Sequence, residues 1–260
     1  MIGAALTYAA TLLFAPLGAL AWGALSRGIA TFFRVLSTPD ALSALKLTFL
    51  LAVGATAINT VFGVAAAWLL VRDRSFPGRR LVNGIVDLPF AVSPVIAGFM
   101  LIVLFGRTGW FAPLADALGV KVLFAVPGML IATTFISLPF VVREIMPVLQ
   151  QLGEEEEDAA YTLGASRWRT FWSITLPGIR PGVQYGVLLT FARAVGEVGA
   201  VLVVSGSIVG LTETSTLFIF RALDERNPVA GYAMALVLAI SSFVLLTAME
   251  WTKRRRSSGV

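Results

Sequence analysis

Long apolar segments separated by short charged ones dominate the chain. A helix needs about 20 residues to cross the hydrocarbon of a bilayer, and about six segments are long and apolar enough to do so. Because backbone polar groups in lipid must be satisfied within the segment, these runs predict helices. The expected spans cover residues 5–25, 46–71, 83–105, 122–142, 183–204 and 230–251. The pattern therefore predicts an all-α polytopic membrane protein, with residues 1–260 forming a single transmembrane domain.

Composition supports this class and removes several others. The chain is 57% hydrophobic and 13% charged, whereas soluble domains carry roughly 25% charged residues. It has no cysteine and no histidine, which excludes disulfides, thiolate metal sites, cysteine nucleophiles and histidine acid–base chemistry. The net charge of the chain is +5. The excess of Lys and Arg in cytoplasmic loops beside membrane spans explains such a charge, so we expect no nucleic-acid partner.

The distribution of basic residues predicts the orientation. When both termini are placed in the cytoplasm, the inner segments hold more Lys and Arg than the outer ones, including the cluster Lys253–Arg256. Cytoplasmic loops of membrane proteins have this excess. We therefore expect cytoplasmic termini, and a cytoplasmic loop between the fourth and fifth spans.

That loop, residues 150–181, is the longest charge-rich segment. Glu154–Asp158 and the residues after it predict a short helix that Gly164 ends, and Ser166 can cap a second helix. The four consecutive glutamates are interpreted as its least informative part, and Pro177 is expected to end the unit. An aromatic face is expected on the second helix at Trp168, Phe171, Trp172 and Thr175.

One pattern in this loop resembles a known family. Asp158-Ala159-Ala160, then Gly164, then Ile174, Leu176 and Pro177 is similar to the cytoplasmic coupling loop of bacterial importer permeases of the ATP-binding-cassette class. The resemblance implies that these residues dock on an ATPase subunit and transmit its closure to the spans. Asp158 stands where the family usually has Glu. The alternative is an amphipathic helix pair at the membrane interface. Below, residues 150–181 are called the coupling loop.

Three further segments resemble sulfate-importer permeases, in particular their W-type subunit. They are residues 87–98, 138–144 and 190–206. Pro89 and Pro94 in the first segment break helical hydrogen bonds. Such a break either lines a cavity or only kinks a packing helix, and the sequence leaves both open. Val198 and residues 207–216 depart from the family's usual form, which leaves the oxyanion open.

The polar residues within the spans are candidates for a translocation pathway. Arg193 and Glu197 are one helical turn apart and can pair. Charges inside a membrane indicate function by default, although such a pair can also only lock the helices together. Hydroxyl groups and helix ends can bind a dianionic oxyanion. The candidate pathway residues are Ser93, Pro94, Arg193, Glu197 and Ser205.

The resemblance implies a complete transporter. The chain would be the permease subunit of an ATP-driven importer for sulfate, and for thiosulfate, in the bacterial inner membrane. Its implied partners are a second permease subunit, either a paralogous T-type chain or an identical copy, two ATP-binding subunits and an external sulfate-binding protein. No Walker motif occurs, so we expect no cofactor on this chain, and ATP and Mg²⁺ on the partner ATPase. The alternatives are a molybdate or tungstate permease, an intramembrane enzyme and a channel.

Overall fold

The computed structural model describes residues 2–73 and 77–257, and these residues form helices and loops with no strand. This confirms the all-α prediction. The elements are α1 Ile2–Leu25, α2 Ile29–Leu36, α3 Pro39–Arg72, α4 Arg79–Ala91, α5 Pro94–Phe105, α6 Ala112–Ala117, α7 Val126–Leu152, α8 Glu155–Thr162, α9 Arg167–Thr170, the π-helical turn η1 Phe171–Thr175, α10 Leu176–Val195, α11 Gly199–Ser205, α12 Ser215–Asp224 and α13 Pro228–Ser257.

The candidate spans reach the predicted number only when bent helix pairs are counted. Within the described residues, three helices are long and apolar enough to cross a membrane, and three pairs with a bend between them bring the total to six. The straight ones belong to α3, α7 and α13, and the bent pairs are α1 with α2, α4 with α5, and the α9–α10 segment with α11.

The span predicted over residues 83–105, with Pro89 and Pro94 inside it, consists of two helices. The chain turns by 117° between α4 and α5. Val92 has an extended backbone, and Pro94 occupies the first turn of α5. A proline disfavours helical geometry in the residue before it, which is why the break falls at Ser93 and α5 starts in a new direction. Pro89, by contrast, is accommodated inside α4.

The predicted end of the coupling unit at Pro177 is wrong, as is the predicted start of the fifth span at residue 183. Pro177 lies in the first turn of α10, and Pro181 lies inside that helix. The π-helical turn η1 directly precedes α10. In an α-helix, a proline ring clashes with the carbonyl oxygen four residues earlier. For Pro177 that carbonyl belongs to η1, whose wider π-helical turn makes room for the ring. The helix therefore continues from Arg167 to Val195.

Helices α3, α7 and α10 pack closely into the centre of the bundle. Small residues permit this approach. A Cβ atom on Gly63 of α3 would lie 2.6 Å from the Val141 side chain of α7, and one on Gly182 of α10 would lie 2.8 Å from the Glu144 carbonyl oxygen. Around them lie fully buried apolar side chains, Leu70, Val141, Val142, Ile145, Leu149 and Ile179.

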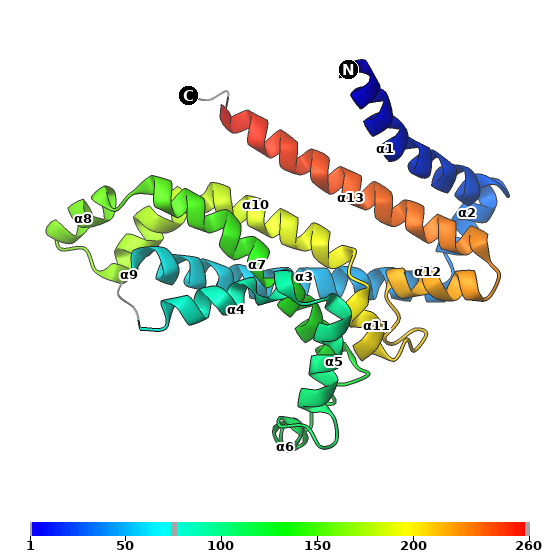
Figure 1. Cartoon of the computed structure of the whole chain (residues 1–260), viewed down its shortest axis with the longest axis horizontal. Helices are drawn as coiled ribbons and strands as arrows, with labels where there is room; N and C mark the ends of the chain where they lie inside the picture. Colours follow the sequence, from blue (N-terminus) through cyan, green and yellow to red (C-terminus); the bar gives the residue numbers. More distant parts are fainter. Residues whose placement is uncertain (1, 74–76, 258–260) are drawn as a thin grey trace.

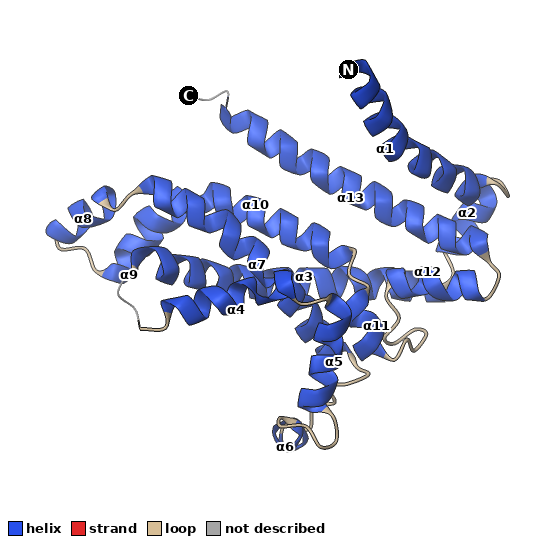
Figure 2. Ribbon diagram, in the orientation of Figure 1, coloured by secondary structure: helices blue, strands red, loops and turns tan. Residues whose placement is uncertain are grey.

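The arrangement separates two regions of the bundle. Helices α3, α4, α7 and α10 run alongside one another, with α8 and α9 at one end (Figure 1). Helix α5 leaves this group at a steep angle and carries α6, while α1 and α13 lie together on the opposite side (Figure 2). The start of α1 and the end of α13 both lie on this side (Figure 1). The α8 end and the α4–α5 break lie at different places on the bundle.

Candidate functional site

The coupling loop has the local geometry that the sequence predicts. Gly164 has φ +85°, and its N–H donates to the Tyr161 carbonyl at 3.0 Å while the Ala165 N–H donates to the Ala160 carbonyl at 3.0 Å. These two bonds form a Schellman motif, in which a left-handed residue ends the helix. Ser166 then begins α9, because its hydroxyl accepts the Arg169 N–H at 3.3 Å. The predicted stop and cap are both confirmed.

One of the four glutamates anchors the loop to the bundle. Glu157 is 5% exposed, and its carboxylate accepts two hydrogen bonds from the Arg72 guanidinium at 3.0 and 3.1 Å. Arg72 also donates to the carbonyls of Leu149 and Gly153, at 3.2 and 2.5 Å. The interpretation of the glutamates as the least informative part is therefore wrong for Glu157. The other three, Glu154–Glu156, are exposed.

The same carboxylate connects the loop to α10. The Thr175 hydroxyl donates to Glu157 at 2.7 Å, and Thr175 immediately precedes Leu176, the first residue of α10. Glu157 thus joins α8 to the end of α3, through Arg72, and to the start of α10, through Thr175.

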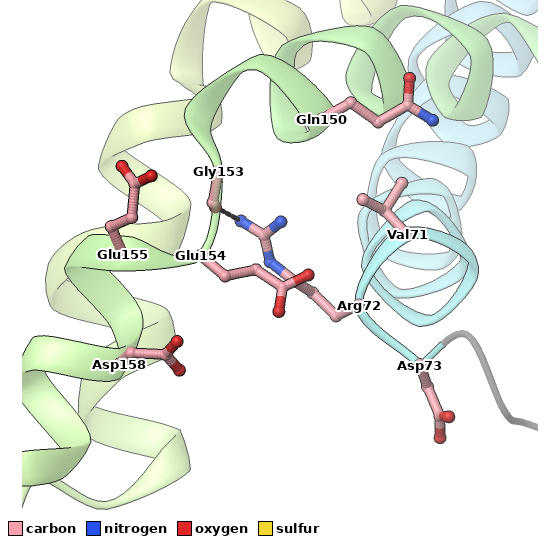
Figure 3. A pocket seen from close by; sticks show the side chains of 8 residues that line it. All are labelled: Val71, Arg72, Asp73, Gln150, Gly153, Glu154, Glu155 and Asp158. Atoms are coloured by element: carbon pink, nitrogen blue, oxygen red, sulfur yellow. Dashed lines mark hydrogen bonds between the residues drawn. The ribbon is translucent and has the colours of Figure 1, made fainter.

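A notch of about 660 Å³ lies beside this anchor. Arg72 forms one wall, and its bond to Gly153 is drawn in Figure 3. The surrounding carboxylates belong to Asp73, Glu154, Glu155 and Asp158. This acidic rim repels anions and attracts basic groups.

The predicted coupling residues fall into two groups. Asp158, Ala159 and Gly164 are exposed on α8 and its end. Ile174, Leu176, Pro177 and Ala160 are partly buried, and Leu176 packs against the core of α3 and α7. The first group is available to a partner, and the second group connects the loop to the bundle.

A second polar site lies where the two broken spans meet. Glycines allow the contact: a Cβ on Gly199 of α11 would lie 2.8 Å from the Pro94 side chain, and one on Gly98 of α5 would lie 2.7 Å from Val203. Beside this contact is a hollow of about 430 Å³, called the Arg193 hollow below. Its lining residues are Pro89, Phe90, Ala91, Val92, Ser93, Pro94, Ile136, Phe140 and Arg193.

Arg193 and Glu197 form the ion pair that their spacing predicts. An Arg193 Nη1 hydrogen bonds to Glu197 Oε2 at 2.7 Å. The Glu197 side chain is 2% exposed, whereas that of Arg193 is 34% exposed. The other Glu197 oxygen accepts the Ala200 N–H at 3.0 Å, so this carboxylate also occupies the beginning of α11. A guanidinium has five N–H donors, and among the residues that the structure describes Glu197 is the hydrogen-bond partner of Arg193.

The structure brings together three of the five candidate pathway residues. Ser93, Pro94 and Arg193 line the hollow. Ser93 begins α5 without using its hydroxyl as a cap, which leaves that hydroxyl available. Glu197 lies behind Arg193. Ser205 lies at the far end of α11, fully buried, where its hydroxyl accepts the Ser207 N–H at 3.0 Å; it does not line the hollow.

Sequence reasoning missed Arg72 and Glu157, which are 85 positions apart. No local pattern distinguishes Glu157 from its three neighbours. It also missed a cluster outside the spans, in which Arg221 hydrogen bonds to Glu213 at 2.6 Å and to Glu225 at 3.2 Å. The Glu213 hydrogen bond raises the pKa of the Arg221 guanidinium above its ordinary range, so this arginine stays charged and fixes α12 beside the loop before it.

Three named relatives are similar to almost the whole chain. The sulfate transport system permease protein CysW of Synechocystis sp. is 45% identical over 98% of this chain and 92% of the relative. CysW of Escherichia coli K12 is 40% identical over 96% and 87%. The permease protein CysT of the same organism is 39% identical over 98% and 91%.

Solved structures share the fold. A bacterial ABC transporter for import of the acidic polysaccharide alginate superposes with a TM-score of 0.80, at 19% identity, over 98% of this chain and 94% of that one. The MetNI methionine ABC transporter superposes with a TM-score of 0.63, at 16% identity, over 82% and 94%. Residues 59–258 match the family described as the binding-protein-dependent transport system inner membrane component. The chain belongs to this family of ABC-transporter permeases.

Proposed function

We propose that the chain is the membrane-spanning permease subunit of an ATP-driven importer for sulfate and thiosulfate. The observation that carries this proposal is Arg193, a partly exposed guanidinium with unused donors in a hollow where two broken spans meet. A tetrahedral dianion needs such donors when it leaves water. The relatives named above are sulfate permeases, which supports sulfate over molybdate or tungstate.

The hollow supplies a weak binding site rather than a tight one. Arg193 contributes one positive charge, and Glu197 neutralises part of it. Ser93 lines the same space at the start of α5, and a helix N-terminus favours an anion. Modest affinity suits a transporter, because the anion must leave the site as readily as it enters.

The coupling loop supports the proposal that ATPases drive this subunit. The exposed surface of Asp158, Ala159 and Gly164 is the docking face for one ATP-binding subunit. Closure of the ATPases moves α8, and the Glu157 anchor transmits this movement to α3 and α10. Helix α10 then carries it to Arg193, over 17 residues from Leu176, or about 26 Å at 1.5 Å per residue.

The complete assembly in this proposal contains two permease subunits, with a paralogous T-type chain beside this one, two ATP-binding subunits and an external sulfate-binding protein. ATP and Mg²⁺ bind the ATPases. The chain lies in the inner membrane with both termini and the coupling loop in the cytoplasm. The excess of basic residues on that side supports this orientation.

Transport by the reconstituted assembly tests the proposal. All subunits are placed in proteoliposomes, the binding protein is added outside, and uptake of labelled sulfate is followed with and without ATP. We expect ATP-dependent uptake that unlabelled thiosulfate inhibits and molybdate inhibits weakly. Stronger inhibition by molybdate than by sulfate would identify the alternative substrate. Uptake without ATP would indicate a channel.

A further inference from the structure

A second arginine lies within the spans on the α8 side of the Arg193 hollow. Arg143 of α7 donates from Nε to Asp87 of α4 at 2.9 Å and from Nη2 to Asn83 at 3.1 Å. A second Asp87 oxygen accepts from the same Nη2. Within residues 2–73 and 77–257, the partner of the remaining nitrogen, Nη1, is the Met146 sulfur at 3.6 Å, which is a weak acceptor. Arg143 therefore has donors available for an additional anion.

Two phenylalanine rings separate Arg143 from the hollow. Phe90 and Phe140 line the hollow and meet edge to face, with their centroids 5.5 Å apart. Asp87 precedes Phe90 by three residues on α4, and Arg143 follows Phe140 by three residues on α7. Residues three apart share a helix face, and both steps lead toward the α8 end. The Asp87–Arg143 pair therefore lies on the same surface as the two rings, about one helical turn closer to the α8 end.

The exposure of this pair indicates that the surface faces water. The Arg143 side chain is 33% exposed and that of Asp87 is 42% exposed, although both belong to candidate spans. Charged side chains in spans face a bundle interior or a water-filled cavity, because contact with lipid is costly. An ion pair that served only to hold α4 against α7 would not need open sides.

We propose that Arg143 is a second oxyanion-binding residue of the pathway, on the cytoplasmic side of the Phe90–Phe140 pair. This inference rests on the proposed function and names a further site for the same dianion. The rings prevent a hydrated anion from passing between the two arginines while they touch. When α4 and α7 separate, the anion leaves Arg193 and binds the free donors of Arg143. Asp87 competes with it there, which keeps the residence time short.

Paired substitutions distinguish an anion site from a structural clamp. The double variant Asp87→Asn/Arg143→Gln removes both charges and keeps two polar side chains that can hydrogen bond to each other. An anion site requires the arginine charge, so we expect uptake of sulfate per ATP hydrolysed to fall about tenfold, the loss of one charge-assisted hydrogen bond. Arg80→Gln is the matched control, because Arg80 is exposed at the start of α4, outside the coupling loop and away from the hollow, and uptake should not change.

Two readouts separate this inference from the proposed function. Failure of the unmodified assembly to import sulfate would reject the proposed function. Import by that assembly, together with unchanged uptake per ATP in the double variant, would reject only the role of Arg143. If the double variant does not assemble with the ATPases, the single variants Arg143→Lys and Arg143→Gln are compared. A retained point charge should preserve at least about a third of the uptake, whereas uptake as low as in Arg143→Gln would contradict an anion site.

Discussion

The Arg72–Glu157 pair at the α8 end and the Arg193–Glu197 pair beside the hollow have the same chemistry in different surroundings. The first pair is closed, with side chains 8% and 6% exposed, and Arg72 also binds two backbone carbonyls. The second pair is open on one side, because Arg193 is 34% exposed and makes one hydrogen bond. A closed pair fixes helices to each other. An open pair keeps donors for a ligand.

Glu157→Ala should have the largest effect, because it leaves the Arg72 guanidinium buried without its counterion. Breaking such a pair from one side costs about 3–5 kcal/mol. We expect a lower thermal unfolding temperature of the detergent-purified assembly and loss of the ATPase subunits from it. Glu156→Ala is the control: Glu156 is exposed next to it in α8, and its removal should change stability by less than about 0.5 kcal/mol. Equal effects of the two substitutions would show that Glu157 does not anchor the loop.

Gly199→Ala tests the contact between the broken spans. The new Cβ would lie 2.8 Å from the Pro94 side chain and 3.3 Å from the Val95 backbone nitrogen, so α5 must move away from α11. Overpacking of this kind costs about 1–3 kcal/mol. We expect lower thermal stability together with slower sulfate uptake, since Pro94 also lines the hollow. Gly84→Ala in α4 has no atom within 4 Å of the new Cβ and serves as the control.

Arg193→Gln should reveal the difference between the two ion pairs, because it should lower sulfate uptake more than thermal stability. The glutamine amide can still donate to the buried Glu197 carboxylate, which also keeps the Ala200 N–H, so we expect a smaller loss of thermal stability than in Glu157→Ala. Sulfate uptake should fall about tenfold, corresponding to one charge-assisted hydrogen bond. A variant in which Arg193 and Glu197 are exchanged is a poorer test, although their i,i+4 spacing would allow the ion pair to form again. Glu197 also accepts the Ala200 N–H at the start of α11, and an arginine there would remove that acceptor. A stability loss in Arg193→Gln as large as in Glu157→Ala would indicate a lock rather than a ligand site.

The sequence predicts the local features of both regions and misses the long-range ones. Apolar length indicates the spans, and Gly164 and Ser166 mark the end and the start of neighbouring helices, because these signals depend on residues within one turn. The Arg193–Glu197 pair is equally local. The Arg72–Glu157 anchor joins α3 to α8 and is visible only in three dimensions. The angle at Ser93 also escapes prediction, since a proline indicates a break but not the direction that packing against α11 imposes.

Gly164→Ala should lower stability only modestly and should have a clear effect on coupling. The residue has φ +85° with nothing within 4 Å of a new Cβ, so the cost is only the left-handed backbone, about 1–2 kcal/mol. Because Gly164 ends α8 on the proposed docking face, the strain is relieved by rotating Ala165 and the start of α9 relative to Asp158. The ratio of sulfate imported to ATP hydrolysed measures this change. We expect the ratio to fall while the assembly stays intact. An unchanged ratio would mean that the orientation of α8 relative to α9 does not control transmission to α10, and that the Glu157 anchor alone carries it.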